Sequence, residues 1–242
     1  MICNNSFLED QFDERFEIIK ADTDELLNTC KKIRYNVFCE ERNIFDPTAH
    51  NNFLEEDHYD THAVQALIRD KTNYEFVATA RLVLSNDRKD SFNYPLEEWV
   101  TTNNHSATEI LRSIKKENTA EVSRFSISKK YRNLPKRTEN NPKNSDSEDA
   151  MMSYLILIGL MKATTEMSAE HNISNWLAFL EPSFLRLLSR FGIKFDTHGP
   201  MINHYGKRYA CERPLAELLN GVKQTKPDAW RLITGNGKVN IH

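Results

Sequence analysis

Glycine and cysteine are scarce in this sequence, and their scarcity argues against several kinds of site. Only seven glycines occur among 242 residues, and neither GxGxxG nor GxxxxGK[ST] is present, so we expect no glycine loop that cradles phosphates. No G-x-S-x-G pattern supports a Ser/His/Asp hydrolase. The four cysteines form neither a CxxC pair nor a zinc-type Cys/His cluster, and we expect free thiols.

Long apolar runs and a large excess of charge are also missing. The most apolar run, MMSYLILIGLM at 151–161, has about half of the ~20 residues needed to cross a bilayer, so we expect a buried helix and no membrane span. The start of the chain shows no apolar secretory signal. A net charge of −3 gives no indication of nucleic acid binding. These features predict a cytoplasmic, globular protein.

Histidine and acidic residues are dense between 50 and 62 without the spacing of a recognised metal site. The donors are His50, Asp57, His58, Asp60 and His62. A single ion needs ligands that converge, and these pairs follow no known ligand pattern. We therefore expect no metal, and polar loop side chains that face water explain the cluster better.

Apolar periodicity and turn residues predict a mixed α/β fold. Strands are expected at 62–69, 76–84, 121–128 and 175–180, with a final hairpin within 193–211. Helices are expected at 22–38, 147–171, 182–192, 213–222 and 226–234, and a short one near 106–118. Asp22 and Glu25 resemble a capping box at the first helix. The order indicates one central mixed sheet flanked by helices, not a doubly wound fold.

Several predicted elements carry ionisable side chains among apolar ones: Arg34, Arg81, Glu121 and Arg124. Taken singly, each is more often solvated or ion-paired. Together they could line one polar cleft with Asp57 and Asp60 as partners, because a charge in an apolar strand is costly unless paired. Residues 121 and 124 of an ideal strand point to opposite faces, so a shared site requires a bulge.

A basic run follows the strand at 121–128. It contains Lys129, Lys130, Arg132, Lys136 and Arg137. In a chain of negative net charge, this local positive patch suits a phosphorylated ligand or an acidic protein surface. The start of a solvated loop explains the same residues equally well.

Several segments together resemble a known family. They are IRYNVFCEERNIF, EEDHYDTHAVQAL, ATARLVL, EVSRFSISKKYR, EPSFLRLLSRFGIKF and GP…YGKRYAC, in that order. The sequence resembles PEP-CTERM/exosortase system-associated acyltransferases, which are similar to acyl-homoserine-lactone (autoinducer) synthases and N-acyl amino acid synthases of the GNAT fold. The resemblance implies a GNAT-like domain over 16–235 with a mostly antiparallel sheet. Residues 1–15 would be an N-terminal extension, 135–149 an exposed loop and 236–242 a C-terminal tail.

The resemblance implies transfer of a fatty acyl group from a thioester to the amine of an amino acid or related small molecule. The expected donor is an acylated phosphopantetheine arm on acyl carrier protein, with no permanently bound cofactor. Two alternatives remain open: a coenzyme A-dependent acetyltransferase of the same fold, and a non-catalytic acyl-binding module. A long apolar cavity would argue against the first alternative.

The resemblance also implies roles for individual residues. Glu121 would be the general base, with Arg34, Arg81 and Arg124 organising the catalytic site. Four residues would serve the amine substrate: Asp57, Asp60, Phe38 and Phe45. The backbone at Phe125, Ser126 and Ile127 would bind the pantetheine arm, and the basic run from Lys129 to Arg137 would dock the carrier.

Two departures from the related synthases matter. Phe45 stands where autoinducer synthases usually carry tryptophan, which argues against S-adenosylmethionine as the acceptor. KKYRNLPKR replaces the usual glycine-rich loop, which favours a carrier protein over coenzyme A.

Overall fold

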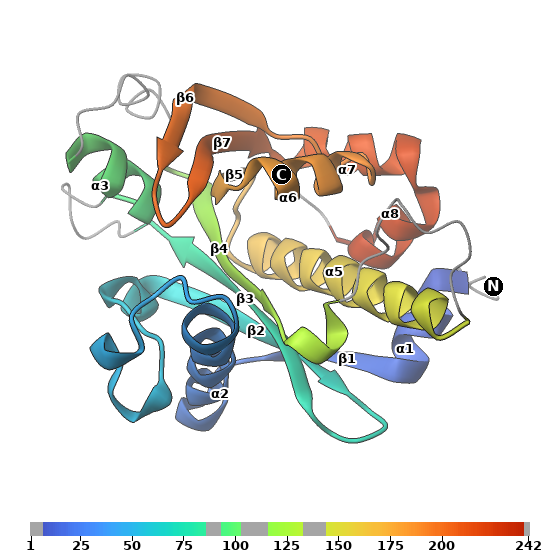
Figure 1. Cartoon of the computed structure of the whole chain (residues 1–242). Helices are drawn as coiled ribbons and strands as arrows, with labels where there is room; N and C mark the ends of the chain where they lie inside the picture. The colour runs from blue at the N-terminus through green and yellow to red at the C-terminus, as the bar shows by residue number, and fades with distance from the viewer. Residues whose placement is uncertain (1–6, 86–92, 103–115, 133–143, 240–242) are drawn as a thin grey trace. The chain divides into compact units, whose positions relative to one another are not determined.

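One mixed sheet organises the part of the chain that the structure covers. The computed structural model describes residues 7–85, 93–102, 116–132 and 144–239. Its strands are β1 (Phe16–Lys20), β2 (Ala63–Asp70), β3 (Phe76–Leu84), β4 (Thr119–Ile127), β5 (Asn175–Leu180), β6 (Asp196–Asn203) and β7 (Lys207–Pro214). The order across the sheet is β1-β2-β3-β4-β5-β7-β6 (Figure 1). β4 and β5 are parallel, whereas the pairs β1/β2, β5/β7 and β6/β7 are antiparallel, which confirms the predicted mixed, mostly antiparallel sheet.

Helices flank this sheet and join its strands. They are α1 (Phe7–Arg15), α2 (Asp24–Tyr35), α3 (Pro95–Thr102), α5 (Asn144–Glu170), α6 (Pro182–Ser189), α7 (Leu215–Thr225) and α8 (Pro227–Thr234). A π-helical turn, η1 (Asn36–Glu41), continues α2. Four short 3₁₀ segments are η2 (Pro47–Ala49), η3 (Asn51–Phe53), η4 (His58–His62) and η5 (Lys129–Tyr131).

The sequence predictions need several corrections. α1, β1 and α3 were not predicted, and α1 lies inside the expected N-terminal extension. Residues 144–149 belong to α5 rather than to an exposed loop, because the helix begins at Asn144. The N-cap of α2 is Thr23, whose hydroxyl accepts a hydrogen bond from the Leu26 amide, and not Asp22. The predicted helix at 106–118 and the loop at 135–143 fall mainly or wholly outside the described residues.

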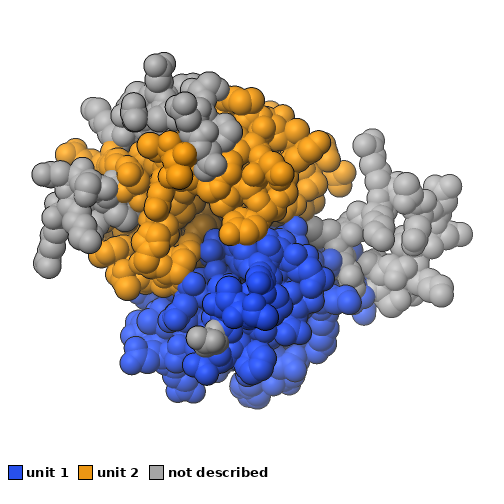
Figure 2. All heavy atoms as spheres, turned by 60° about the vertical axis from the view of Figure 1, so that its left-hand side comes forward, with its two compact units in different colours: residues 1–56, 65–80, 124–163 blue, residues 57–64, 81–123, 164–242 orange. Residues whose placement is uncertain are grey.

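The described residues group into two compact units that interleave along the chain. Unit 1 comprises residues 1–56, 65–80 and 124–163, and unit 2 comprises residues 57–64, 81–123 and 164–242 (Figure 2). Each unit has its own hydrophobic core.

In unit 1, both faces of β2 are covered. Leu67 packs with Cys30, Ile33 and Val37, so α2 buries its apolar stripe on that face of the sheet. The next residue, Ile68, points the other way, because side chains alternate along a strand. A Cβ atom at Gly159 of α5 would lie 2.3 Å from the Phe12 ring and 2.9 Å from Ile68. Glycine at this position therefore lets α5 pack tightly against α1 and the second face of β2.

In unit 2, helix α3 packs against residues of β3, β5 and β7. Leu96 and Val100 of α3 pack with Val83, Leu177 and Ala210 in one buried cluster. The neighbouring Trp176 points to the opposite face of β5, where its indole N–H donates to the Ser168 hydroxyl of α5 at 2.8 Å. Unit 2 is therefore also built around strands that are covered on both faces.

Three cysteines lie in the described part of the chain. Cys30, Cys39 and Cys211 are buried thiols that form no disulfide, as predicted. Burial raises the pKa of Cys211 to about 12, so it stays protonated at neutral pH. No helix in the described part of the chain combines the length and apolarity needed to cross a membrane.

Candidate functional site

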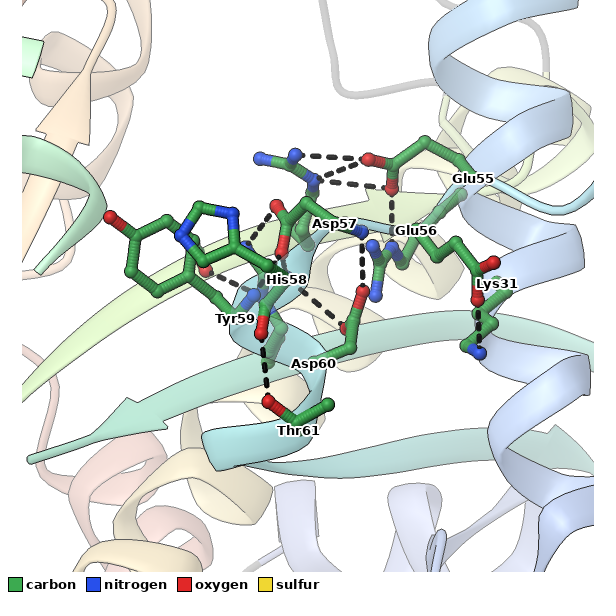
Figure 3. A network of polar contacts seen from close by, with 12 residues as sticks. Lys31, Glu55, Glu56, Asp57, His58, Tyr59, Asp60 and Thr61 are labelled. Atoms are coloured by element: carbon green, nitrogen blue, oxygen red, sulfur yellow. Dashed lines mark hydrogen bonds and ion pairs between the residues drawn. The ribbon is translucent and has the colours of Figure 1, made fainter. Parts of the chain in front are cut away.

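A carboxylate that the sequence analysis did not select joins two of the predicted arginines in unit 1. Glu55 accepts a hydrogen bond from Nε of Arg34 at 2.5 Å and from Nη2 of Arg124 at 2.9 Å (Figure 3). Arg34 also donates to the Gln65 side chain at 3.2 Å. Arg34 and Glu55 are almost completely buried, so each of these charges depends on its partners.

The two arginines keep Glu55 ionised. Burial alone raises the pKa of a carboxyl group, because it removes water from the charged form. Against this, the charges of Arg124 and Arg34 and their hydrogen bonds hold the pKa of Glu55 below its usual range. Glu55 is therefore a carboxylate at neutral pH and a structural anchor for both guanidinium groups.

Arg124 adopts an unusual backbone conformation in the middle of β4. Its φ angle is +54°, in the left-handed region that side chains other than glycine seldom adopt. The β-bulge predicted between Glu121 and Arg124 stays a prediction, because a positive φ angle at Arg124 is not in itself a bulge. A strained residue inside a strand needs compensation, which the hydrogen bonds to Glu55 provide.

Aromatic rings support the same guanidinium. The Arg124 guanidinium carbon lies 5.1 Å from the Phe45 ring centroid and 5.8 Å from that of Phe38. The two rings are 5.3 Å apart and contact each other. Cation–π contacts of this kind hold a guanidinium in one place while leaving its outer N–H groups available for polar partners. Phe38 and Phe45, predicted as substrate-binding residues, thus gather with Arg124 and Arg34 in unit 1.

Unit 2 contains a second group of predicted residues. The buried Arg81 donates to Asp57 from both Nη1 and Nη2, at 2.6 and 3.1 Å, and to Asp60 at 3.1 Å. Its Nε donates to the Ser123 hydroxyl at 3.1 Å. Each nitrogen of this guanidinium therefore has a partner. The sequence predicted the two aspartates as possible partners of the charged residues as a group, and the structure pairs them with Arg81.

The two aspartates also hold the backbone that carries them. Asp57 and Asp60 form a reciprocal capping box on η4, and the Asp57 amide donates to Asp60 at 2.9 Å (Figure 3). The Tyr59 amide donates to Asp57 at 3.0 Å. The turn is therefore fixed by the same carboxylates that bind Arg81, and their positions are set before any ligand arrives.

Tyr59 and Glu98 lie in the same unit and were not selected from the sequence. The Tyr59 hydroxyl donates to Oε2 of Glu98, and His58 Nε2 lies 3.6 Å from the same oxygen. Burial, together with the hydrogen bond to Glu98 and its charge, raises the pKa of Tyr59 well above its usual value. Tyr59 is therefore a hydrogen-bond donor to Glu98 at neutral pH.

Glu121, the predicted general base, holds the start of a helix. It is buried, and its Oε2 accepts a hydrogen bond from the Leu96 amide in the first turn of α3 at 2.8 Å. A carboxylate at a helix N-terminus is stabilised in its charged form. Glu97 binds the same region, because its Oε2 accepts from the Tyr94 amide at 2.9 Å. Both buried glutamates therefore cap the N-terminus of α3.

The basic run is partly neutralised in unit 1. Arg132 Nη2 donates to Glu41 Oε2 at 2.9 Å, and Lys130 Nζ donates to Glu75 at 3.1 Å. The Lys129 side chain is exposed. Lys136 and Arg137 lie outside the described residues. The positive patch is weaker than the sequence suggests, since two of its described cations have acidic partners.

The structure assigns several predicted residues to ordinary strand positions. Ser126 is fully buried, and its hydroxyl donates to the Arg124 carbonyl at 3.1 Å, while Phe125 and Ile127 are half-buried.

Glu55 was missed because it stands in a polar loop, among the acidic residues of FLEEDHYD. The signal that could have identified Glu55 is that two arginines on mostly apolar elements need a carboxylate partner.

No group of three or more His, Cys, Asp or Glu residues in the described segments has a geometry that could hold a metal ion.

Comparisons with known proteins agree on the fold. Residues 33–139 match the family model described as an acetyltransferase (GNAT) domain. A search of curated proteins finds no match. Forty-two chains of solved structures match.

Three of the matching solved structures show how similar they are to this chain in sequence and in fold. TofI, solved in a ternary complex with an inhibitor and MTA, has 19% sequence identity and a TM-score of 0.58, over 89% of this chain and 99% of TofI. FeeM, an N-acyl amino acid synthase from uncultured soil microbes, has 13% identity and a TM-score of 0.56, over 88% and 97%. BjaI, a CoA-dependent acyl-homoserine lactone synthase solved with SAM and isopentyl-CoA, has 16% identity and a TM-score of 0.55, over 89% of each chain. Identities this low show a shared fold and no more.

Proposed function

We propose that this chain, whose residues 33–139 match a GNAT acetyltransferase model, is an acyltransferase that transfers a fatty acyl group from a thioester to the amine of an amino acid or related small molecule. In the reaction, the amine nitrogen attacks the thioester carbonyl. The C–S bond breaks, the thiol leaves, and the amine proton is passed to a base. The products are an amide and a free phosphopantetheine thiol.

The observation that carries the proposal is the charged strand β4. A buried carboxylate, Glu121, and a strained arginine, Arg124, lie three residues apart in it. Neither is required by the sheet itself, and Arg124 is held in place at the expense of backbone strain. Strain retained inside a strand is characteristic of functional positions.

Glu121 is the proposed general base. An ammonium group must lose a proton before its nitrogen can attack, so a carboxylate close to it, directly or through one water, assists the reaction. The hydrogen bond from the Leu96 amide at 2.8 Å orients the Glu121 carboxylate.

The remaining roles follow from the chemistry of the side chains. Asp57 and Asp60, held by Arg81, are proposed to bind the cationic amine substrate, and Phe38 and Phe45 to provide apolar contacts for it. The backbone at Phe125, Ser126 and Ile127 is proposed to bind the pantetheine arm and to stabilise the oxyanion of the tetrahedral intermediate. Glu55 positions Arg34 and Arg124 and is not proposed to contact substrate.

Acyl carrier protein is the proposed donor partner. Carrier proteins present an acidic surface, which suits the exposed Lys129 and the neighbouring basic residues. Coenzyme A is the second candidate, supported by the fold shared with a CoA-dependent synthase. The two donors share the phosphopantetheine thioester, so both are compatible with the same chemistry.

The proposal is tested by mass spectrometry of lipid extracts from cells that overproduce the wild-type chain or the Glu121→Gln variant. A new N-acyl species in the wild-type extract that disappears with the variant supports the reaction and identifies both acyl chain and amine. If neither extract contains a new species, purified protein is supplied with acylated carrier, acyl-CoA and an amine mixture. An intact thioester under those conditions would leave acyl binding without catalysis as the function.

A further inference from the structure

Glu41 contacts the segment of the basic run at two points in unit 1, one of them an ion pair with Arg132. Its Oε2 accepts a hydrogen bond from Arg132 Nη2 at 2.9 Å, and its Oε1 accepts from the Lys129 backbone amide at 3.2 Å. The two residues come from distant parts of the sequence, because Glu41 ends the π-helical turn η1 and Arg132 follows η5. Both carboxylate oxygens are therefore used on the segment to which the basic run belongs.

The contact is accessible to solvent. The Arg132 side chain is 32% exposed and that of Glu41 is 20% exposed. An ion pair that water reaches is weak, because solvent screens the attraction and the free side chains regain conformational freedom when it opens. A phosphate monoester carries more charge than a carboxylate and offers three acceptor oxygens to a guanidinium. It can therefore replace Glu41 at Arg132 at little cost.

A second ion pair on the same segment differs from this one. Lys130 Nζ donates to Glu75 at 3.1 Å, but these side chains are 66% and 57% exposed. Lysine lacks the planar fork that binds two phosphate oxygens at once. The Glu75–Lys130 pair is therefore a matched internal control, since it has the same charges and belongs to the same segment.

We propose that Glu41 competes with the phosphate of the donor for Arg132 and so limits the affinity of the protein for its donor. This inference rests on the proposed function, because it assigns the phosphopantetheine phosphate to the basic segment. Only a donor that carries this phosphate can displace the Glu41 carboxylate. Pantetheine thioesters without a phosphate do not compete for Arg132, so Glu41 does not affect their binding.

The test measures binding of 4′-phosphopantetheine and of pantetheine, which lacks the phosphate, to the full chain by calorimetry. Removing the competing charge in Glu41→Gln should tighten 4′-phosphopantetheine binding by about 3- to 10-fold, the range of a solvent-exposed ion pair. Binding of pantetheine should not change. Glu75→Gln should behave as wild type, and Glu41→Gln/Arg132→Gln should lose the gain.

Coenzyme A and holo-carrier protein are then compared as sources of the same phosphate. A gain for both assigns Glu41 to the shared phosphopantetheine arm, whereas a gain for one identifies the natural source. Equal affinities of Glu41→Gln and wild type for 4′-phosphopantetheine, or no binding to Glu41→Gln at millimolar concentrations, would overturn the inference. Amide formation by the wild-type chain is measured in parallel, so the proposed reaction can stand when the role of Glu41 fails.

Discussion

The carboxylate of Glu55 binds the guanidinium of Arg124 through two nitrogens, with Oε1 at 3.1 Å from Nε and at 2.9 Å from Nη2. This contact holds a side chain whose backbone has a φ angle of +54° in β4. The same carboxylate binds the fully buried Arg34 of α2. Glu55 therefore ties a loop to a helix and to the strand on which the proposed chemistry depends.

The first prediction concerns the stability that Glu55 provides. Glu55→Gln leaves the Arg34 guanidinium buried without a full countercharge, so we expect the free energy of unfolding to fall by about 3 kcal/mol. Glu56→Gln is the control, because Glu56 is exposed and its ion pair with Lys31 should contribute less than about 1 kcal/mol. Urea denaturation of the three proteins measures both values. Equal losses in the two variants would contradict the role assigned to Glu55.

The second prediction is a pH dependence with a defined sign. The folded-state pKa of Glu55 lies below the unfolded value of about 4.3, so its stabilising contribution is present above that pH. The contribution is lost as the pH falls through the lower, folded-state pKa. Between pH 6 and pH 3, unfolding free energies should therefore decline more steeply for wild type than for Glu55→Gln. Parallel declines would show that the pKa of Glu55 is not lowered by folding.

The third prediction separates the backbone of Arg124 from its side chain. Arg124→Ala and Arg124→Gly both remove the guanidinium, but only glycine adopts positive φ without steric cost. We expect the glycine variant to be more stable than the alanine variant by about 1 kcal/mol. An alanine variant at least as stable as the glycine variant would mean that the left-handed conformation at this position is not retained.

How far the sequence predicts this protein depends on the range of the interactions involved. The strands at 76–84 and 175–180 were predicted with their observed bounds, because alternation and apolar content are local signals. α1 and β1 were missed because FLEDQFDER is mostly polar and FEIIK is only five residues long, so neither carries a strong local signal. Local patterns therefore predicted most strands of the sheet but not the edge strand β1.

The residues of the candidate site likewise divide into those that the sequence predicted and those that it missed. Asp57 and Asp60 were predicted as possible partners of the charged residues, since buried charges require partners, but not as partners of Arg81 in particular. Glu55 was missed, although it lies two positions from Asp57, because nothing local distinguishes it from Glu56. The capping role of Glu121 was also missed, because α3 itself was not predicted. No described residue bears on the PEP-CTERM/exosortase association, which stays a prediction from the resemblance.

The fourth prediction concerns the donor. Lys129 has an exposed side chain, so Lys129→Gln should raise the KM for the acylated carrier about twofold to fivefold through weaker electrostatic attraction. The KM for the amine should not change. Lys238→Gln is the control, because this exposed lysine follows α8, far along the chain from the basic segment. An unchanged KM for the carrier in Lys129→Gln would remove Lys129 from the docking surface.

The most direct test of acyl transfer compares two buried glutamates that both cap α3. Glu121 and Glu97 accept main-chain hydrogen bonds from Leu96 and Tyr94, and a glutamine oxygen can accept the same bonds in either variant. The measurement is thiol release from an acylated carrier with a mixture of amines, together with amide formation, for wild type, Glu121→Gln and Glu97→Gln. A proton acceptor contributes about 10²- to 10⁴-fold, so Glu121→Gln should lose at least about 100-fold in rate while Glu97→Gln stays close to wild type. Rates for Glu121→Gln within a few-fold of those for Glu97→Gln would contradict the assignment of Glu121 as the base of an acyl transfer.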